Sequence, residues 1–169
     1  MLQRILFYSS LALMGASEDA ALHISLPIKG LKLSDIQDTF EQRRGGTRKH
    51  EATDIMAPRG TPVSAVNDGK IVKLFLSKPG GNTIYQFDPS EQYCYYYAHL
   101  DRYAPGIAEG TMVHRGEVIA FVGSSGNADP SAPHLHFEIH RLEAERRWYK
   151  GTAINPYKYL VDALTDGHG

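Results

Sequence analysis

Two histidines separated by one residue stand in the segment 133–138, Pro-His-Leu-His-Phe-Glu. In an extended strand successive side chains point to opposite faces, so His134, His136 and Glu138 would share one face and the apolar residues between them would pack into a core. Two imidazoles that project together from a strand can present their nitrogens to one metal ion. Taken alone, the segment fits a pair of surface histidines equally well.

A second pair of candidate ligands, His50 and Asp54, is four residues apart. A helix would bring the two side chains to about 6 Å, whereas a straight strand would separate them by about 13 Å, too far for one ion with bonds of about 2 Å. If both bind one metal, residues 50–54 must be helical or sharply curved. Taken alone, the pair is more simply an exposed His and Asp in a loop.

His99 ends a tyrosine-rich run that includes Tyr95 and Tyr97. Strict alternation along a strand places these three side chains on one face. A single strand histidine is usually structural, but beside two other histidine sites in a small chain it is a candidate for proton transfer or for stabilising an oxyanion. The remaining histidines show no clustering in the sequence: His23, His114, His140 and His168.

Composition limits the class of protein that could carry this chemistry. With 169 residues, 42% of them hydrophobic and 22% charged, the chain fits one globular domain with short extensions. Eighteen basic and nineteen acidic residues leave a net charge of −1, so no global field attracts nucleic acid and no such partner is expected. The single Cys94 excludes an intrachain disulfide and every cysteine-based zinc cluster; we expect it to be a buried, inert thiol.

The N-terminus has the features of a short secretory signal. Arg4 precedes an apolar run over residues 5–14, and the small residues 15–17 follow. This order predicts export to the periplasm, the cell envelope or the medium; the alternative is an N-terminal helix that docks on the domain. The run is too short to cross a bilayer, so no transmembrane span is expected beyond a possible signal or anchor.

From residue 54 onward, short β-branched or aromatic runs recur between Gly, Pro, Asn and Asp, which predicts an all-β domain built as an antiparallel sheet or small β-sandwich. The turn signal Asn67-Asp68-Gly69 predicts a tight hairpin, and a short helical turn is expected around residues 34–40. Residues 43–49 carry four positive charges and either contact an anionic substrate group or form a solvated loop. The expected strands are 63–66, 70–76, 82–87, 92–99, 117–122 and 135–140.

Together these motifs resemble the lysostaphin-type, or LytM-like, zinc metallopeptidases of family M23. Their hallmarks are a His-x-x-x-Asp pair, a downstream His-x-His and another His between them. The likeness extends from about Thr39 to Leu160 and includes residues 54–63, 65–69, 97–100, 122–127 and 133–138 as well as Gly110, Val113 and Gly116. The resemblance implies a duplicated-hybrid-type β fold with long loops and a peptidase domain over 49–162, preceded by a signal or anchor (1–22) and an extension (23–48) and followed by a loose tail (163–169).

The resemblance also implies a role for each histidine site. His50, Asp54 and His136 would be the zinc ligands, and His99 and His134 would be the catalytic partners, with the roles of general base and oxyanion donor interchangeable between them. Most family members have Gly at the position of Ala52, so the curved segment must form here without it.

The implied function is hydrolysis of peptide cross-links in bacterial cell-wall peptidoglycan by an exported, monomeric zinc endopeptidase. Whether the bond is a glycyl bridge or a D-amino-acid cross-link is open. Tyr95, Tyr97 and Tyr103 are candidates for the substrate groove, with the loops 78–82 and 123–133 around it. The alternatives are a non-catalytic domain of the same fold that activates a cell-wall amidase, and a plain peptidoglycan-binding module; neither needs all five site residues.

Overall fold

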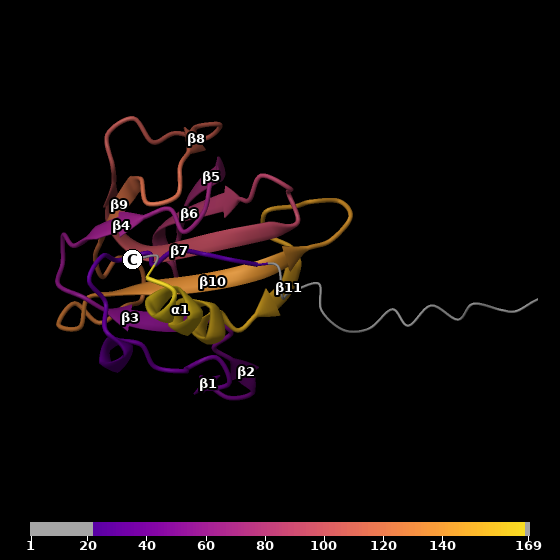
Figure 1. The fold of residues 1–169 in the computed structure, drawn as a ribbon. Helices are drawn as coiled ribbons and strands as arrows, with labels where there is room; N and C mark the ends of the chain where they lie inside the picture. The colour runs from indigo at the N-terminus through magenta and orange to yellow at the C-terminus, as the bar shows by residue number, and fades with distance from the viewer. Residues whose placement is uncertain (1–21, 168–169) are drawn as a thin grey trace, which may run out of the picture.

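The computed structural model describes residues 22–167, and within them the chain forms an antiparallel sheet of nine strands, a two-stranded hairpin and one α-helix (Figure 1). The all-β prediction is confirmed; the predicted signal segment lies outside the described residues. The elements are a 3-10 helix (Leu33–Asp35), β1 (Arg43–Arg44), β2 (Arg48–Lys49), β3 (Thr53–Met56), β4 (Pro62–Ser64), β5 (Gly69–Ser77), β6 (Gly81–Phe87), β7 (Tyr93–Tyr103), β8 (Met112–Val113), β9 (Val118–Val122), β10 (His134–Leu142), β11 (Gly151–Ile154) and α1 (Pro156–Thr165).

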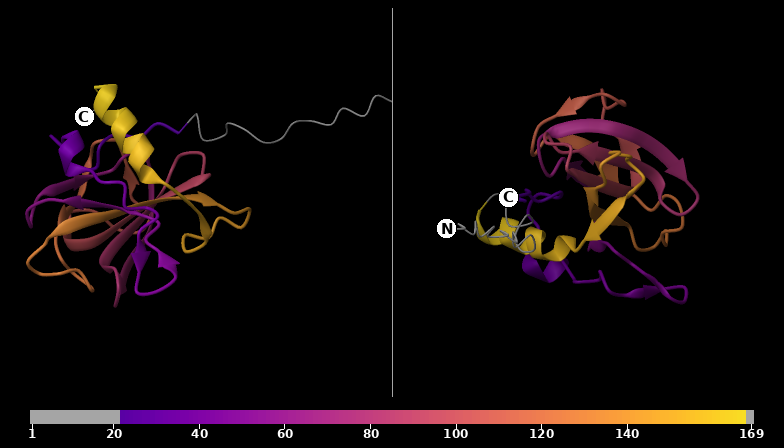
Figure 2. Two further views of the ribbon diagram at one scale, coloured as in Figure 1. Left: turned by 90° about the horizontal axis from the view of Figure 1, so that it is seen from below. Right: turned by 90° about the vertical axis from the view of Figure 1, so that its right-hand side faces the viewer.

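The long strands β7 and β10 form the middle of the large sheet, whose main order is β11-β10-β7-β6-β5-β8. β3 pairs with the first half of β10 and β11 with its second half, while β7 lies along the opposite edge. β9 joins β4 to β7. The β1–β2 hairpin projects beyond β3, and α1 lies across the sheet beside β10 (Figures 1 and 2). Among residues 22–167, no helix has the length and apolarity that a membrane crossing requires.

The alternation predicted for β10 is confirmed. Leu135, Phe137 and Ile139 are fully buried, and the residues between them are only partly buried. They pack on the core side of β7, where Tyr95 and Tyr97 are also fully buried. The Tyr97 hydroxyl donates to Gln86 Oε1 (2.9 Å) and accepts from the Val66 amide (3.0 Å), so the buried phenol keeps its hydrogen bonds.

The alternation predicted at the end of β7 is wrong, because β7 contains a bulge. Between the partner pairs Ile84↔Tyr97 and Asn82↔Leu100 the two strands differ by one residue, and His99 has a left-handed backbone with φ 59°. A bulge residue in this conformation breaks the two-residue period. His99 therefore leaves the face of Tyr95 and Tyr97 and turns to the side of the sheet that bears His136.

The hairpin predicted at residues 67–69 is wrong, and one helix was not predicted. Asn67-Asp68-Gly69 does not close a hairpin, since β4 pairs with β9 whereas β5 pairs with β6 and β8. The helix α1 was not expected, although its signal is present: the Asn155 side chain accepts from the Tyr157 amide (3.0 Å), and Pro156 occupies the first helical position. The helical turn expected around 34–40 is the 3-10 helix at Leu33–Asp35.

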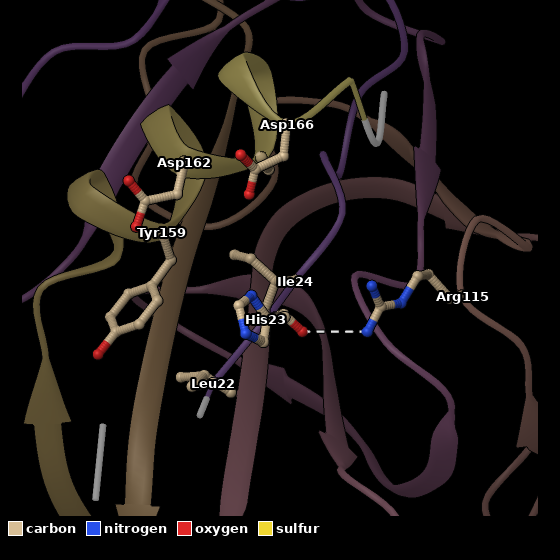
Figure 3. A pocket seen from close by; sticks show the side chains of 8 residues that line it. Leu22, His23, Ile24, Arg115, Tyr159, Asp162 and Asp166 are labelled. Atoms are coloured by element: carbon tan, nitrogen blue, oxygen red, sulfur yellow. Dashed lines mark hydrogen bonds between the residues drawn. The ribbon is translucent and has the colours of Figure 1, made fainter. Parts of the chain in front are cut away.

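Residues 22–28 run along the sheet, with Leu22, Ile24, Leu26 and Ile28 buried in the main core. A cavity of about 300 Å³ lies between the start of this segment, α1 and Arg115 (Figure 3). Arg115 donates to the His23 carbonyl (3.1 Å) across it, the contact that is dashed in Figure 3. The cavity shares no residue with the candidate metal site described below.

The turn 78–82 packs closely against the loop that begins at Gly123 and is hydrogen-bonded to it. Gly81 has φ 65°, and a Cβ there would lie 2.5 Å from the Gly126 amide nitrogen and closer still to Ser125. Asn82 donates to Ser125 Oγ (3.0 Å), which donates to the Leu100 carbonyl (2.7 Å). Gly81 is therefore needed both for its backbone angle and for this close approach.

We expect Gly81→Ala to lower the free energy of unfolding by about 2–4 kcal/mol, since it adds a backbone collision to the strain of a left-handed residue. Gly106→Ala is the matched control: its φ is 83° and a Cβ there meets nothing within 4 Å, so only about 1 kcal/mol should be lost. Urea unfolding of the three proteins measures both values. Equal losses in the two variants would contradict the close packing of these loops.

Candidate metal centre

Three potential ligand atoms from distant parts of the chain meet beside β3 and β10. His50 precedes β3, Asp54 lies in it, and Asp54 is paired directly with His136 of β10. His50 Nε2 lies 3.1 Å from His136 Nδ1 and 3.1 Å from Asp54 Oδ1, and His136 Nδ1 lies 3.0 Å from Asp54 Oδ1. A tetrahedral ion with bonds of about 2.0–2.1 Å separates its ligands by about 3.3 Å. Two imidazole nitrogens and a carboxylate oxygen at this spacing fit such an ion.

Residues 50–54 are sharply curved rather than helical. Glu51 has φ 58°, a left-handed angle that brings the His50 side chain back over Asp54 before β3 begins at Thr53. The positive angle thus falls on Glu51 and not on Ala52, which is fully buried. The curve forms without glycine at position 52.

Hydrogen bonds fix the orientation of both candidate ligand imidazoles. His50 Nδ1 lies 3.2 Å from the Thr39 carbonyl, which can only accept, so Nδ1 carries the hydrogen and Nε2 keeps its lone pair. His136 Nε2 donates to Glu138 Oε1 (2.7 Å), so Nδ1 is the nitrogen that faces Asp54 and His50. Partners of this kind set the tautomer of metal-binding histidines. Thr39 also contacts the curved segment directly, donating from Oγ1 to the Ala52 carbonyl (3.1 Å).

His99 and His134 lie beside this cluster with their rings 4.8 Å apart. His134 Nδ1 donates to the Ala132 carbonyl (2.9 Å), and His99 Nδ1 donates to the Ser125 carbonyl (2.8 Å). In the neutral ring each Nε2 is then a proton acceptor. His134 Nε2 lies 3.9 Å from Asp54 Oδ1, so His134 is adjacent to the candidate ligands.

The site contains strongly perturbed titrating groups. Burial alone would raise the pKa of Asp54, but hydrogen bonds from His136 and His50 hold it well below its usual range. Burial would lower the pKa of His136, but its bonds to Asp54 and Glu138 raise it to about 9. Burial opposes the ionisation of Glu138, whose hydrogen bonds with His136 and His140 lower its pKa to about 2. Burial lowers the pKa of His99 to about 4.

Four functional candidates were not assigned a role from the sequence. Glu138 and His140 lie on the His136 face of β10, and His140 Nε2 is 2.7 Å from Glu138 Oε2, so the period-two pattern could have found both. Arg44 donates to Asp54 Oδ2 (2.7 Å) and lies 3.3 Å from His50 Nε2. Thr39 and Arg44 come from segments before β3, and no sequence pattern connects them with the site.

A cleft of about 270 Å³ opens beside His99 and His136. Its aromatic wall is not the expected one: Tyr95 and Tyr97 are in the core, and Tyr103 donates to the Thr83 carbonyl (3.2 Å) away from the cleft. The residues that line the cleft on this side are Tyr85, Tyr96, Trp148 and Tyr149. The loops expected around the cleft do contribute to it, through Pro79, Gly80 and Asn127.

Comparison with known proteins identifies relatives of the region that contains the three candidate ligands. The family model described as Peptidase family M23 matches residues 48–156. An L-Ala--D-Glu endopeptidase of Bacillus subtilis is 36% identical over 121 residues, which cover 69% of this chain and 36% of the relative. The peptidoglycan DD-endopeptidase ShyC of Vibrio cholerae is 33% identical over 109 residues, 62% of this chain and 24% of the relative. The matches therefore span about a quarter to a third of the length of these relatives.

The solved catalytic domain of the antimicrobial peptidase lysostaphin from Staphylococcus simulans has the same fold. Its TM-score is 0.64 at 29% sequence identity, and the match covers 76% of this chain and 95% of that domain.

The raised pKa of His136 predicts that metal binding releases a proton. Its pKa of about 9 lies above the ordinary value of about 6.5, so at pH 7 the metal-free protein holds a proton that must leave Nδ1 before a metal binds there. We expect release of about one proton at pH 7, declining as the pH rises through 9. Calorimetry of metal binding in buffers of different ionisation enthalpy measures it, and Glu138→Gln should release less. A buffer-independent enthalpy at pH 7 would contradict the assignment.

Proposed function

The chain belongs to peptidase family M23, and from that premise we propose that it is a zinc-dependent endopeptidase that hydrolyses peptide cross-links of bacterial cell-wall peptidoglycan. The observation that carries the proposal is the triangle of ligand atoms from His50, Asp54 and His136, with sides of 3.0–3.1 Å and two further imidazoles beside it. Relatives named as an L-Ala--D-Glu endopeptidase and a peptidoglycan DD-endopeptidase support the substrate class.

The donor set favours zinc in a catalytic role. Two imidazoles and one carboxylate are ligands that zinc accepts, and three protein ligands leave a fourth position open, as catalytic sites require. When bound, the ion would supply a water of lowered pKa and would polarise the carbonyl of the scissile bond. In this assignment Thr39 and Glu138 hold the two imidazoles in the required tautomers.

We assign the general base to His134. Its Nε2 is the proton-accepting nitrogen, and it lies 3.9 Å from the Asp54 carboxylate, so the acceptor is beside the candidate ligands. His99 presents the same acceptor nitrogen, and its lowered pKa keeps it neutral at pH 7. His99 can therefore donate to an oxyanion only once the proton that His134 removes from the water has reached its Nε2, so its role follows that of His134.

The alternative of a non-catalytic amidase-activating domain is not favoured. An adaptor needs no metal, yet this chain keeps both candidate ligand histidines, the carboxylate, and hydrogen bonds that orient both rings. We propose that residues 49–162 form the peptidase domain and that the mature protein is exported. Residues 22–28 share the core of that domain.

Substitution separates the ligands from the catalytic partners. His136→Ala leaves two protein ligands, so zinc content and cleavage of purified sacculi should both collapse. His134→Ala should keep zinc but lose about 100–10,000-fold in rate with the general base. His99→Ala should also keep zinc and lose about 100–1,000-fold. Elemental analysis beside cleavage rates measures these effects. Loss of zinc from His99→Ala to the same extent as from His136→Ala would refute the assigned roles.

Zinc should also stabilise the fold, because its ligands come together only in the folded chain. At a free concentration of about 100 times the dissociation constant, the ion contributes about 2.7 kcal/mol, or roughly 5–10 °C in melting temperature for a domain of this size. Thermal unfolding with a chelator and after zinc is restored measures the shift. The His136→Ala variant is the control and should not respond. An unchanged melting temperature after complete metal removal would count against the site.

A further inference from the structure

The β1–β2 hairpin places two arginines on one face. Arg44 is paired directly with Arg48 across the hairpin, and Arg43 with Lys49. Directly paired residues of an antiparallel ladder project to the same side, and adjacent residues project to opposite sides. Arg44 and Arg48 therefore share one face, and like charges at such positions repel each other unless an anion lies nearby.

The face that bears Arg44 and Arg48 is turned toward the metal centre. Arg44 fixes this direction through its 2.7 Å ion pair with Asp54. Arg48 lines the aromatic cleft of about 270 Å³ together with His99 and His136. It also lines a neighbouring hollow of about 450 Å³ that is bounded by His50 and by residues 151–153 of β11.

No anionic side chain among residues 22–167 forms an ion pair with Arg48. Within that part of the chain the Arg48 side chain forms no hydrogen bond either, whereas Lys49, which also lines the second hollow, is paired with Glu41 (2.7 Å). Glu138 lines both hollows, but its two oxygens already accept from His136 and His140. Glu51 lines the second hollow and is exposed. The cleft thus presents an uncompensated guanidinium beside the candidate catalytic residues.

We propose that Arg48 forms a carboxylate-binding subsite, so that the preferred substrate is a peptide with a free carboxylate within about two residues of the scissile bond and not an uncharged glycyl bridge. A guanidinium binds a carboxylate through two parallel N–H···O bonds, which give geometric selectivity as well as charge. The distance in residues is estimated from the cleft: Arg48 and His136 line one hollow of about 270 Å³, which is roughly two extended residues across. The inference rests on the proposed function and specifies its substrate.

The aromatic wall strengthens the expected ion pair. Tyr85 packs against Tyr96 and against Trp148, with both pairs of ring centroids 4.6 Å apart. A peptide held between this wall and Arg48 excludes water from the guanidinium, and the lower local dielectric strengthens its attraction for a carboxylate.

Trp148 fluorescence can report peptide binding, because Trp148 is the single tryptophan of the chain and lines the cleft. Its fluorescence can be titrated in metal-free protein, where no bond is cleaved. Three end-blocked probes are needed: a peptide with an L-Ala–D-Glu bond, the same peptide with D-Gln in place of D-Glu, and pentaglycine. We expect the acid to bind about tenfold more tightly than the amide, and pentaglycine to bind no better than the amide.

Three variants test the assignment to Arg48. Arg48→Ala should remove the difference between acid and amide, and Arg48→Lys should retain only part of it because the ammonium lacks the guanidinium fork. Arg43→Ala, on the opposite face of the same hairpin, is the matched control and should keep the full difference. The acid should also lose affinity as salt is raised, whereas the amide should not.

The inference is overturned if wild-type protein binds the acid and the amide equally, if the difference survives Arg48→Ala, or if Arg43→Ala abolishes it as well. Cleavage of sacculi by the zinc-loaded protein tests the proposed function separately from the carboxylate subsite. Cleavage without charge discrimination would refute the carboxylate subsite and leave the proposed function intact. Discrimination without cleavage of any peptide would support the subsite and refute the endopeptidase.

Discussion

The antiparallel pairing of β3 with the first half of β10 is the constraint on which the site depends. It sets Asp54 directly opposite His136, two residues that are 82 positions apart in the chain. On the other edge of β10, β7 sets Ala98 opposite His136, and the bulge that follows turns His99 to the same side. Slipping either pairing by one residue would exchange the faces and move the imidazoles into the core.

Sequence patterns were reliable where one strand determined the outcome. The alternation in β10 placed His134, His136 and Glu138 on the open face because Leu135 and Phe137 must be buried. The same reasoning failed at Tyr95, Tyr97 and His99, since a bulge depends on the partner strand and breaks the period. The sequence showed only that residues 50–54 must curve if His50 and Asp54 bind one ion. The left-handed φ angle of Glu51 provides that curve.

The polar contacts around the candidate metal centre are tertiary and have no local signature. Thr39 reaches His50 from eleven residues away, and Arg44 reaches Asp54 from the hairpin. These contacts orient the ligand atoms and balance the charge of Asp54, and the same hairpin that supplies Arg44 places Arg48 on the wall of the cleft. The candidate ligands and the proposed carboxylate subsite are thereby linked through one short segment that precedes β3.

Anomalous diffraction at the zinc absorption edge, from crystals of the zinc-loaded protein, tests the central claim most directly. The account predicts a single strong peak within about 2.0–2.2 Å of His50 Nε2, His136 Nδ1 and an Asp54 oxygen, with His99 and His134 outside bonding distance. A peak bonded to His99 or His134, or the absence of a peak between β3 and β10 in fully loaded protein, would contradict it.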